Sequence, residues 1–484
     1  MISRRELIGA LGTLPAVGLL GPGKIYAEAA RQLPRRTLGR TGRQVVPLAL
    51  GGIASLNYPA PGLDVADIVV RAVQLGINYL DTANAYGPSQ LHYGEAFRRL
   101  HLTPSDPDYN HELRQDLYIA SKTAFRYGKH PNMPRTWEPG PVRSAVEDLQ
   151  RTMTQLFGDS KGSVPDGAYL DCIQIHNLYM PEHVDQIYEG LAERGTYNHP
   201  ERIGALATLL DYRDGTNYTG LNPERRTWVR HIGVTGHASS ELLMRAVRLD
   251  NQDIFDTVLM ALNANDRLYD SMQNNILPLA AARGIGVIAM KIFSDGAMYG
   301  GPKTYLNNTN NIIRTVGKPG MVSPKDLIRY PLSLPGVTCA VTGIGVIDRE
   351  NPERDQLLTN LAGAVSDMPS EIERARIERE VQEKHGRDTN FFQAVRKQIV
   401  QPSVVRVSKD TDHVLIEWNT AYAGPDPIRT YEIRSGDRLL ASVPYRPQLT
   451  EALFRISIPA SEVGNGEISV TGSTSLPREK AASA

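Results

Sequence analysis

The stretch Leu50-Gly51-Gly52-Ile53-Ala54-Ser55-Leu56 follows the first predicted strand, Val45–Leu50, of a 484-residue chain. An open, doubly wound parallel sheet that binds a dinucleotide would favour a Gly-x-Gly-x-x-Gly turn at this point. The two adjacent glycines do not fit that pattern. The stretch therefore favours the other common arrangement of repeated βα units, a closed barrel, if eight strands follow one another.

Eight short runs rich in β-branched residues alternate with helical patterns between about residues 36 and 365. Several runs are continuously apolar, which is typical of strands covered on both faces of a parallel sheet. Asp64 is placed to cap the first helix, which ends at Gly76. We therefore predict an α/β fold, a (β/α)8 barrel over residues 35–368, with function at the carboxyl ends of its strands. The predicted strands are Val45–Leu50, Asn78–Thr82, Leu117–Ser121, Tyr169–Ile175, His231–Thr235, Val258–Asn263, Val287–Lys291 and Thr338–Gly343.

The composition is that of a globular protein, with 41% hydrophobic and 22% charged residues and a net charge of +0. This neutral balance removes the electrostatic case for nucleic acid or an anionic membrane as the main partner. The two cysteines, Cys172 and Cys339, are interpreted as small buried apolar residues in strands. The sequence has no His-Glu-x-x-His or paired Cys-x-x-Cys motif, so no metal site is predicted.

The first 29 residues are interpreted as a twin-arginine signal peptide. Arg4 and Arg5 precede an apolar stretch from Leu7 to Leu20, and Ala27-Glu28-Ala29 offers a small-x-small cleavage site. An ordinary amphipathic helix or an uncleaved anchor is the alternative. We expect export of the folded protein to the periplasm or the cell exterior, with no membrane contact after cleavage of the signal.

The composition changes after the barrel. Residues 369–400 are predicted to be helical and strongly charged, and residues 402–472 contain six short alternating strands with Trp418 and Tyr431 in their core. This pattern resembles a fibronectin type III or immunoglobulin-like β-sandwich module. The module is interpreted as a structural cap, or else as a site that binds a glycan or a protein partner. Residues 473–484 are predicted to be a disordered tail.

The loop from Phe293 to Pro324 follows the seventh predicted strand and is rich in Gly and Asn. Loops of this length in a compact domain are usually lids or disordered inserts. Because this loop leaves from the end of the barrel that is expected to carry function, we favour a lid.

Four polar residues stand at the carboxyl ends of predicted strands, namely Asp81, Tyr86, Lys122 and His176. A closed parallel barrel brings these ends together at one mouth. A free tyrosine has a pKa of ~10, so it needs help to exchange a proton near neutral pH. A lysine cation stabilises the phenolate, an aspartate orients that lysine, and a histidine can bind a carbonyl oxygen. Taken singly, the same residues are ordinary: a helix cap, a rim aromatic, a surface lysine and a core histidine.

With these residues the chain resembles the aldo-keto reductase superfamily from about residue 35 to 365. Arg36–Gly42 matches the amino-terminal hairpin of the family, and Asp81–Gly87 matches its Asp-Thr-Ala-x-x-Tyr-Gly signature. The resemblance implies a carbonyl–alcohol oxidoreductase with a catalytic tetrad. The implied roles are Tyr86 as general acid/base, Lys122 and Asp81 as the pair that sets its pKa, and His176 as the residue that orients the carbonyl.

The resemblance also implies a nicotinamide cofactor, with its phosphates near backbone amides and a helix N-terminus after the eighth strand. Three positions depart from the family pattern: Gly236 lacks the usual amide, Asn263 replaces a glutamine, and Met290 replaces a stacking tyrosine. Family habit favours NADP(H) over NAD(H), with Arg349 and Arg354 as candidates for reading a 2′-phosphate. The expected cofactor-binding residues are Thr235, Asn263, Met290, Lys291, Gly343, Ile344, Gly345, Gln356 and Asn360.

These features predict an NAD(P)-dependent oxidoreductase that interconverts a carbonyl and an alcohol on an extracytoplasmic small molecule. Export favours a sugar or a sugar derivative as the substrate. Export also favours a tightly bound cofactor, because soluble nicotinamide is not expected to be replenished outside the cytoplasm. The alternative is a cofactor-bound binding or regulatory subunit with little turnover.

Overall fold

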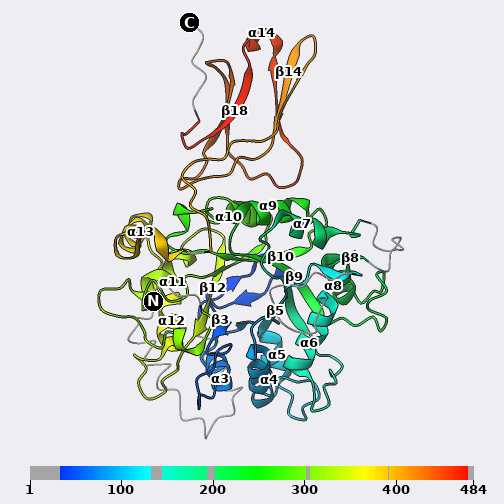
Figure 1. Ribbon diagram of the computed structural model, residues 1–484, viewed down its shortest axis with the longest axis vertical. Helices are drawn as coiled ribbons and strands as arrows, with labels where there is room; N and C mark the ends of the chain where they lie inside the picture. The colour runs from blue at the N-terminus through cyan, green and yellow to red at the C-terminus, as the bar shows by residue number, and fades with distance from the viewer. Residues whose placement is uncertain (1–32, 132–143, 193–201, 301–305, 391, 478–484) are drawn as a thin grey trace.

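Eight parallel strands form a closed barrel at the centre of the protein, as the computed structural model in Figure 1 shows. The structure describes residues 33–131, 144–192, 202–300, 306–390 and 392–477. The strands follow one another around the barrel in chain order, so the predicted (β/α)8 TIM barrel is confirmed. They are β3 (Leu48–Ala54), β4 (Tyr79–Asp81), β5 (Tyr118–Thr123), β7 (Leu170–Ile175), β9 (Val229–Gly236), β10 (Phe255–Ala261), β11 (Gly286–Met290) and β12 (Val337–Ile344).

Helices surround the barrel (Figure 1). Val65 directly precedes the first helix and makes no side-chain hydrogen bond there. Asp64, one residue earlier, accepts a hydrogen bond from Arg99 at 2.6 Å, and Arg99 together with the backbone N–H groups of Asp67 and Ala66 in the first turn lowers the pKa of Asp64. The barrel helices are α3 (Ala66–Gln74), α4 (Ser89–Arg99), α5 (His111–Asp116), α6 (Ala145–Phe157), α7 (Pro181–Tyr188), α8 (Ala205–Asp214), α9 (Ser240–Leu249), α10 (Ile276–Ala282), α11 (Pro324–Leu332) and α12 (Gln356–Ala364). Short 3-10 turns are η1 (Gly39–Thr41), η2 (Asp266–Leu268), η3 (Thr309–Asn311) and η4 (Gly386–Thr389).

The first barrel strand extends further than the sequence indicates. The prediction ended this strand at Leu50, whereas β3 continues through Gly51 and Gly52 to Ala54. A Cβ atom at Gly52 would come within 2.5 Å of Ser89 Oγ at the start of α4. The glycine therefore lets the strand pass close to the helix and reach the barrel mouth.

The amino-terminal hairpin covers one end of the barrel. The strands β1 (Arg36–Thr37) and β2 (Gln44–Val45) pair antiparallel, and the fully buried Leu38 lies between them in sequence. The backbone N–H of Arg40 donates to the carbonyl of Gly284 at 2.6 Å, next to β11. A second small pair, β6 (Tyr127–Lys129) with β8 (Ile203–Gly204), lies outside the barrel sheet.

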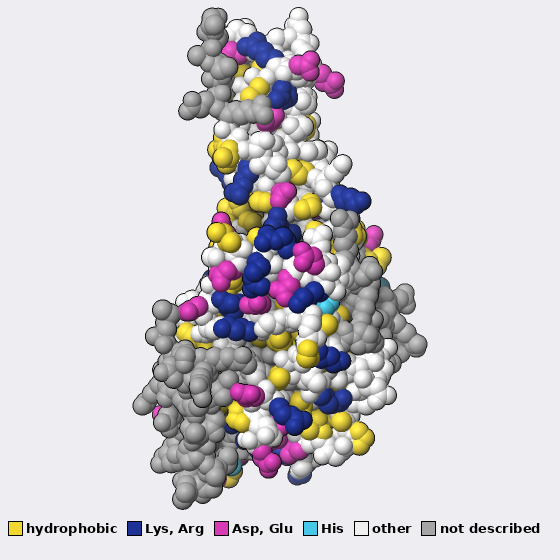
Figure 2. Space-filling model, turned by 90° about the vertical axis from the view of Figure 1, so that its left-hand side faces the viewer, with side chains coloured by type: hydrophobic (Ala, Val, Ile, Leu, Met, Phe, Trp, Pro, Cys, Tyr) yellow, Lys and Arg dark blue, Asp and Glu magenta, His cyan; other side chains and the backbone are white. Residues whose placement is uncertain are grey.

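The charged segment after the barrel is helical only in part. The helix α13 covers Glu371–His385 and ends where Gly386 adopts φ 61°. The prediction of a helical segment over residues 369–400 is therefore wrong beyond this point, because the backbone turns back to the barrel, where Asn265 donates to the carbonyl of Gly386 at 2.9 Å. Figure 2 shows basic and acidic side chains interspersed on the face of the protein that carries this helix. One such group joins Arg376 to Asp326 and Glu380.

Two three-stranded antiparallel sheets form the C-terminal β-sandwich. One contains β13 (Val405–Lys409), β14 (His413–Trp418) and β17 (Phe454–Pro459), and the other β15 (Thr430–Ser435), β16 (Arg438–Pro444) and β18 (Ile468–Ser473). A short helix, α14 (Ala460–Val463), follows β17. The rings of Trp418 and Tyr431 lie 5.7 Å apart in the core between the sheets. The predicted sandwich is confirmed, while its likeness to fibronectin type III modules stays a prediction.

The sandwich is attached to the barrel next to α10 (Figure 1). Asn275, at the start of α10, donates to the carbonyl of Ala423 at 3.2 Å and accepts from its N–H at 2.7 Å. The neighbouring Asn274 donates to the carbonyl of Gly424 at 3.0 Å. Both asparagines are buried, so these hydrogen bonds are sheltered from water.

None of the helices within the described ranges has both the length and the apolar character needed to cross a bilayer. The predicted signal peptide, residues 1–29, and the last part of the predicted tail, residues 478–484, lie outside the described residues. Residues 301–305 of the loop that was predicted to be a lid also lie outside them.

We expect Asn275→Ala to lower the free energy of unfolding by about 1–3 kcal/mol, because it leaves the N–H and the carbonyl of Ala423 unpaired at a buried contact. Urea unfolding of the full chain measures this loss. The matched control is Asn251→Ala, at an exposed asparagine. Equal stability of the two variants would contradict a stabilising role for this attachment.

Candidate active site

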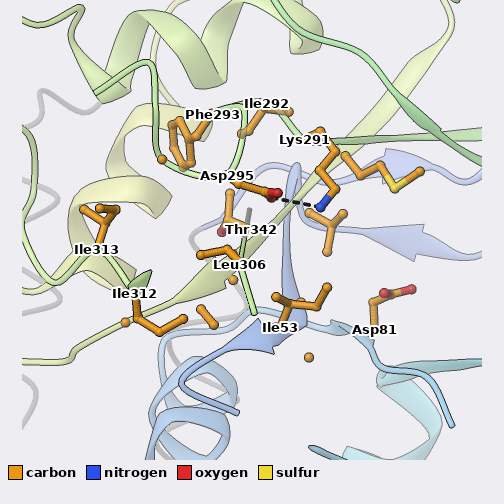
Figure 3. A pocket seen from close by; sticks show the side chains of 18 of the residues that line it. Ile53, Asp81, Lys291, Ile292, Phe293, Asp295, Leu306, Ile312, Ile313 and Thr342 are labelled. Atoms are coloured by element: carbon orange, nitrogen blue, oxygen red, sulfur yellow. Dashed lines mark hydrogen bonds and ion pairs between the residues drawn. The ribbon is translucent and has the colours of Figure 1, made fainter. Parts of the chain in front are cut away.

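A pocket of about 810 Å³, counting the part open to solvent, lies at the carboxyl ends of the barrel strands. Its walls come from β3, β10, β11 and β12 and from the loops that follow β4, β9, β11 and β12. Figure 3 shows apolar side chains on several sides of this pocket and the polar residues Asp81, Lys291 and Asp295 among them. The lining includes Gly51, Gly52, Ile53, Ala54, Asp81, Tyr86, His237, Leu259, Met290, Lys291, Ile292, Phe293, Asp295, Gly296, Tyr299, Leu306, Ile312, Ile313, Val341, Thr342, Gly343 and Gly345.

Three residues of the predicted tetrad meet beside this pocket. Lys122, on β5, is only 1% exposed, and its Nζ donates to Asp81 Oδ1 at the end of β4 and to the carbonyl of Thr82 at 2.7 Å. The same Nζ lies 4.8 Å from the centre of the Tyr86 ring. A cation is therefore fixed next to the tyrosine ring.

Burial dominates the electrostatics of the Lys122–Asp81 pair. It raises the pKa of the Asp81 carboxyl and lowers the pKa of the Lys122 ammonium. The opposite charge of each partner opposes that shift, as does the hydrogen bond between them. The ion pair with Asp81 allows Lys122 to remain charged although it is buried away from water.

His176 completes the set from the end of β7. Its ring centre lies 5.6 Å from that of Tyr86, with the planes at 79°. Its backbone N–H donates to the carbonyl of Thr123 at 2.8 Å, next to Lys122 in the chain. Burial, and then the positive charge of Lys122, hold the pKa of His176 well below its usual value. The imidazole is therefore neutral at neutral pH.

The loop that carries Tyr86 is held in place by sequence features of its own. Gly87 adopts φ 45°, and a Cβ atom there would come within 2.7 Å of Asn57 Oδ1, so the turn requires glycine. Asn84 donates to Thr152 Oγ1 at 2.8 Å and to the carbonyl of Asp148 at 2.6 Å, both on α6. The tyrosine is thus positioned by the strand before it and by the neighbouring helix.

Four of the nine expected cofactor residues line the pocket, namely Met290, Lys291, Gly343 and Gly345. Lys291 Nζ donates to Asp295 Oδ1 at 2.8 Å, so its charge is balanced inside the pocket. The sequence drew attention to Lys291 but not to its partner.

Five expected cofactor residues are not among the lining residues of the pocket. Thr235 Oγ1 accepts the N–H of Asn177 at 2.7 Å. The Asn263 side chain donates to the carbonyl of Lys291 at 3.1 Å and accepts the N–H of Asn265 at 2.9 Å. These two side chains brace the barrel mouth. The remaining three, which are also buried, are Ile344, Gln356 and Asn360.

Gln356 takes up the backbone amides at which a phosphate was expected. Its Oε1 accepts the N–H of Gly345 at 2.8 Å and that of Val346 at 3.1 Å. Its Nε2 donates to the carbonyls of Ile313 and Thr315, each at 2.8 Å. The pocket offers Met290 and Lys291 to a nicotinamide cofactor, whereas these two amides are engaged by Gln356 in this conformation.

The two arginines proposed to read a 2′-phosphate lie outside the pocket lining. Arg349 donates to Asp67 at 2.7 Å and to Gln74 at 3.3 Å, on α3. Arg354 has 78% of its side chain exposed and lies 3.8 Å from Asp348. Of the two arginines, Arg354 therefore makes the weaker contacts with the rest of the protein.

Sequence reasoning missed several residues of the pocket. His237 follows β9 directly, and its place at a strand end was a usable signal. Its Nδ1 lies 3.0 Å from Asn177 Oδ1, and burial with nearby Lys291 lowers its pKa to about 3. Tyr299 and the isoleucines belong to the loop after β11, which the sequence indicated as a lid without marking any single residue in it as part of the site. The described parts of that loop form one wall of the pocket.

Comparison with known proteins places the chain in a family. Residues 47–349 match the Aldo/keto reductase family. The curated "Uncharacterized oxidoreductase YqkF" of Bacillus subtilis (strain 168) is 24% identical over 162 residues, which are 33% of this chain and 44% of that protein. The match thus spans less than half of that relative.

Two solved structures are similar to part of the chain at low identity. The "putative aldo-keto reductase" from Pseudomonas aeruginosa has a TM-score of 0.41 and 20% identity, covering 68% of this chain and 94% of that one. The holo form of an aldo-keto reductase from Bacillus halodurans has a TM-score of 0.43 and 16% identity, covering 74% of this chain and all of that one. The family match at residues 47–349 extends over more than half of the chain, which therefore belongs to the aldo/keto reductase family.

Proposed function

We propose that this protein is an NAD(P)-dependent oxidoreductase that interconverts a carbonyl and an alcohol, with Tyr86 as its general acid/base. One observation carries the proposal: Lys122 Nζ, paired with Asp81, lies 4.8 Å from the centre of the Tyr86 ring at the barrel-mouth pocket. Membership of the family supports oxidoreduction with a nicotinamide cofactor.

The proton chemistry follows from the charges around Tyr86. As the alcohol forms, the Tyr86 hydroxyl gives its proton to the carbonyl oxygen, and in the reverse direction it takes that proton back. Lys122 stabilises the phenolate, and Asp81 holds the lysine charged and in place. The neutral His176, next to the tyrosine, orients the carbonyl oxygen by a hydrogen bond.

A nicotinamide cofactor supplies or accepts the hydride when it is bound. Met290, which lines the pocket, would hold the nicotinamide ring through its thioether, less rigidly than an aromatic side chain would. Gly343 and Gly345 line the pocket at the end of β12, and a Cβ at Gly345 would collide with the carbonyl oxygen of Ile313, so this glycine lets the loop after β11 pack against the strand end. Following the family resemblance, we favour NADP(H) over NAD(H), with Arg354 as the residue that reads the 2′-phosphate.

We further propose that the protein acts outside the cytoplasm, on a sugar or a sugar derivative, with a cofactor that stays bound between turnovers. The arginine pair and the cleavage site in residues 1–29 support export. The C-terminal sandwich is proposed to be a structural cap, or a contact site for a glycan or a protein.

A cofactor-bound regulatory or binding subunit is the second candidate function. The hydrogen bonds from Gly345 and Val346 to Gln356 favour it, because they occupy amides that a catalytic cofactor site would use. A measurement of turnover distinguishes the two candidate functions, because an oxidoreductase turns over its substrate and a regulatory or binding subunit has little turnover.

We expect Tyr86→Phe to lower kcat by about 10²- to 10⁴-fold, because it removes the proton that the carbonyl oxygen needs. Binding of NADPH, measured by fluorescence titration, should stay within twofold of the wild type. Tyr218→Phe, at an exposed tyrosine, is the matched control. Unchanged turnover in Tyr86→Phe would show that another group supplies the proton.

We expect His176→Gln to reduce the loss of stability at acid pH. The pKa of His176 in the folded protein lies below the unfolded value of about 6.5, so the unfolded chain binds this proton first as the pH falls. This histidine therefore lowers the free energy of unfolding below about pH 6.5. Urea unfolding at pH 7.5 and 5.5 should show a smaller difference for His176→Gln than for the wild type. His111→Gln, on the surface, serves as the control, and equal differences in all three would contradict the shift.

We expect Arg354→Ala to weaken NADPH binding about tenfold and to leave NADH binding unchanged, because a charged hydrogen bond to the 2′-phosphate is lost. Arg349→Ala is the matched control, since Arg349 already pairs with Asp67. Fluorescence titration of both variants measures the two dissociation constants. Equal effects of Arg354→Ala on NADPH and NADH would remove the case for 2′-phosphate recognition.

A further inference from the structure

Two polar side chains on the pocket wall take no part in the proposed proton chemistry. Asp295 follows β11, and its side chain is 6% exposed, while Thr342 is buried on β12. Both line the pocket, and Figure 3 draws them there with Lys291. Within the described parts of the chain, no hydrogen-bond partner reaches Asp295 Oδ2 or Thr342 Oγ1. Buried polar atoms of this kind normally have a partner, so a bound molecule is the natural source of one.

The Asp295 carboxylate is held firmly in its position. Lys291 Nζ donates to its Oδ1 at 2.8 Å, which leaves the second oxygen to the pocket. Lys291, Ser294 and Asp295 all have φ between 48° and 57°, a conformation that residues other than glycine rarely adopt. Hydrogen bonds hold this turn, from Ser294 Oγ to the carbonyl of Thr389 and from Asn263 to the carbonyl of Lys291. Strain that the surrounding structure maintains in this way is typical of functional positions.

The charges and hydrogen-bonding groups of Asp295, Lys291 and Thr342 determine which kind of ligand group can bind beside them. An ionised carboxylate only accepts hydrogen bonds, so the ligand must offer an O–H or an N–H at Asp295. Lys291 disfavours an amine by charge, and the carboxylate disfavours a phosphate. A neutral hydroxyl meets both conditions, and the Thr342 hydroxyl can donate to or accept from a second one.

The rest of the wall fits the carbon side of a sugar ring. Apolar side chains surround the two polar ones, so C–H groups of a ring can pack there while its hydroxyls reach Asp295 and Thr342. The apolar neighbours labelled in Figure 3 are Ile53, Ile292, Phe293, Leu306, Ile312 and Ile313.

We propose that Asp295 and Thr342 form a hydroxyl-binding pair that recognises neighbouring hydroxyls of a five- or six-membered sugar ring in the barrel-mouth pocket. The inference rests on the proposed function, which it deepens by naming the group that is recognised. Two sources offer the same chemistry, the ribose of the nicotinamide cofactor and a sugar-derived substrate. Asp295 and Thr342 are specificity-determining residues and take no part in proton transfer.

Saturation-transfer NMR of the full chain with D-ribose tests the pair without any need for turnover. Asp295→Asn and Thr342→Val keep the size of the side chain and remove the acceptor charge or the hydroxyl. Each should weaken ribose binding by a factor on the order of ten. The matched control, Asp185→Asn, changes an aspartate paired with Arg245 on the outer surface and should bind ribose as the wild type does. Thermal unfolding of each variant shows that the fold is kept.

Two further measurements on the same variants identify the source of the hydroxyls. If the cofactor ribose is bound, Asp295→Asn raises the Kd for NADPH about tenfold and lowers kcat/KM equally for glyceraldehyde and propanal. If a substrate hydroxyl is bound, the NADPH Kd is unchanged and kcat/KM falls for glyceraldehyde alone. The proposal is overturned if ribose binding, the NADPH Kd and the ratio of the two aldehydes all match the wild type. Full turnover in Tyr86→Phe would defeat the proposed function instead, and ribose binding would still decide the role of Asp295.

Discussion

The buried ion pair between Lys122 and Asp81 is the constraint on which the rest of the site depends. Two charges removed from water at a strand end are stable only when each faces the other with good geometry. They lie on neighbouring strands, so the register of β4 against β5, which pairs Asp81 with Ala120, decides whether they can meet. The carbonyl of Thr82 accepts a further hydrogen bond from the lysine. A closed barrel fixes that register, and with it the cation beside Tyr86.

The sequence could predict the barrel and the tetrad for the same reason. Strand ends in a parallel barrel share one mouth, so residues far apart in the chain, such as Asp81 and His176, are brought together by topology alone. The alternation of apolar runs was enough to find all eight strands. The boundaries were less accurate: β3 runs on through Gly51 and Gly52 because a small residue is needed where the strand passes α4. The contact between Gly52 and α4 is a tertiary one, so it cannot be read from the spacing of residues in the sequence.

The cofactor region could be predicted only in part. A residue's position at a strand end does not show whether its side chain forms hydrogen bonds with a ligand or with neighbouring protein groups. Thr235 and Asn263 stand at the expected ends, yet both are bonded to backbone groups of the barrel mouth. Asp295 escaped notice for a different reason. Its place in the pocket depends on a turn in left-handed φ that local preferences of its residue types would not suggest.

Gln356 links the end of β12 to the loop after β11 through one amide group. Its oxygen accepts from Gly345 and Val346, and its nitrogen donates to the carbonyls of Ile313 and Thr315. Any group that binds the two N–H groups must first displace this oxygen, and the displaced amide can then no longer hold the loop in the same way. Ile313 lines the pocket. Binding of a ligand to the N–H groups of Gly345 and Val346 is therefore coupled to the conformation of the loop that carries Ile313. The Asp295 Oδ2 atom, by contrast, has no hydrogen-bond partner among the described residues, so a ligand there would displace none. The Asp295 side and the Gln356 side of the pocket therefore differ, because only a ligand at the Gly345 and Val346 amides would have to break existing hydrogen bonds of Gln356.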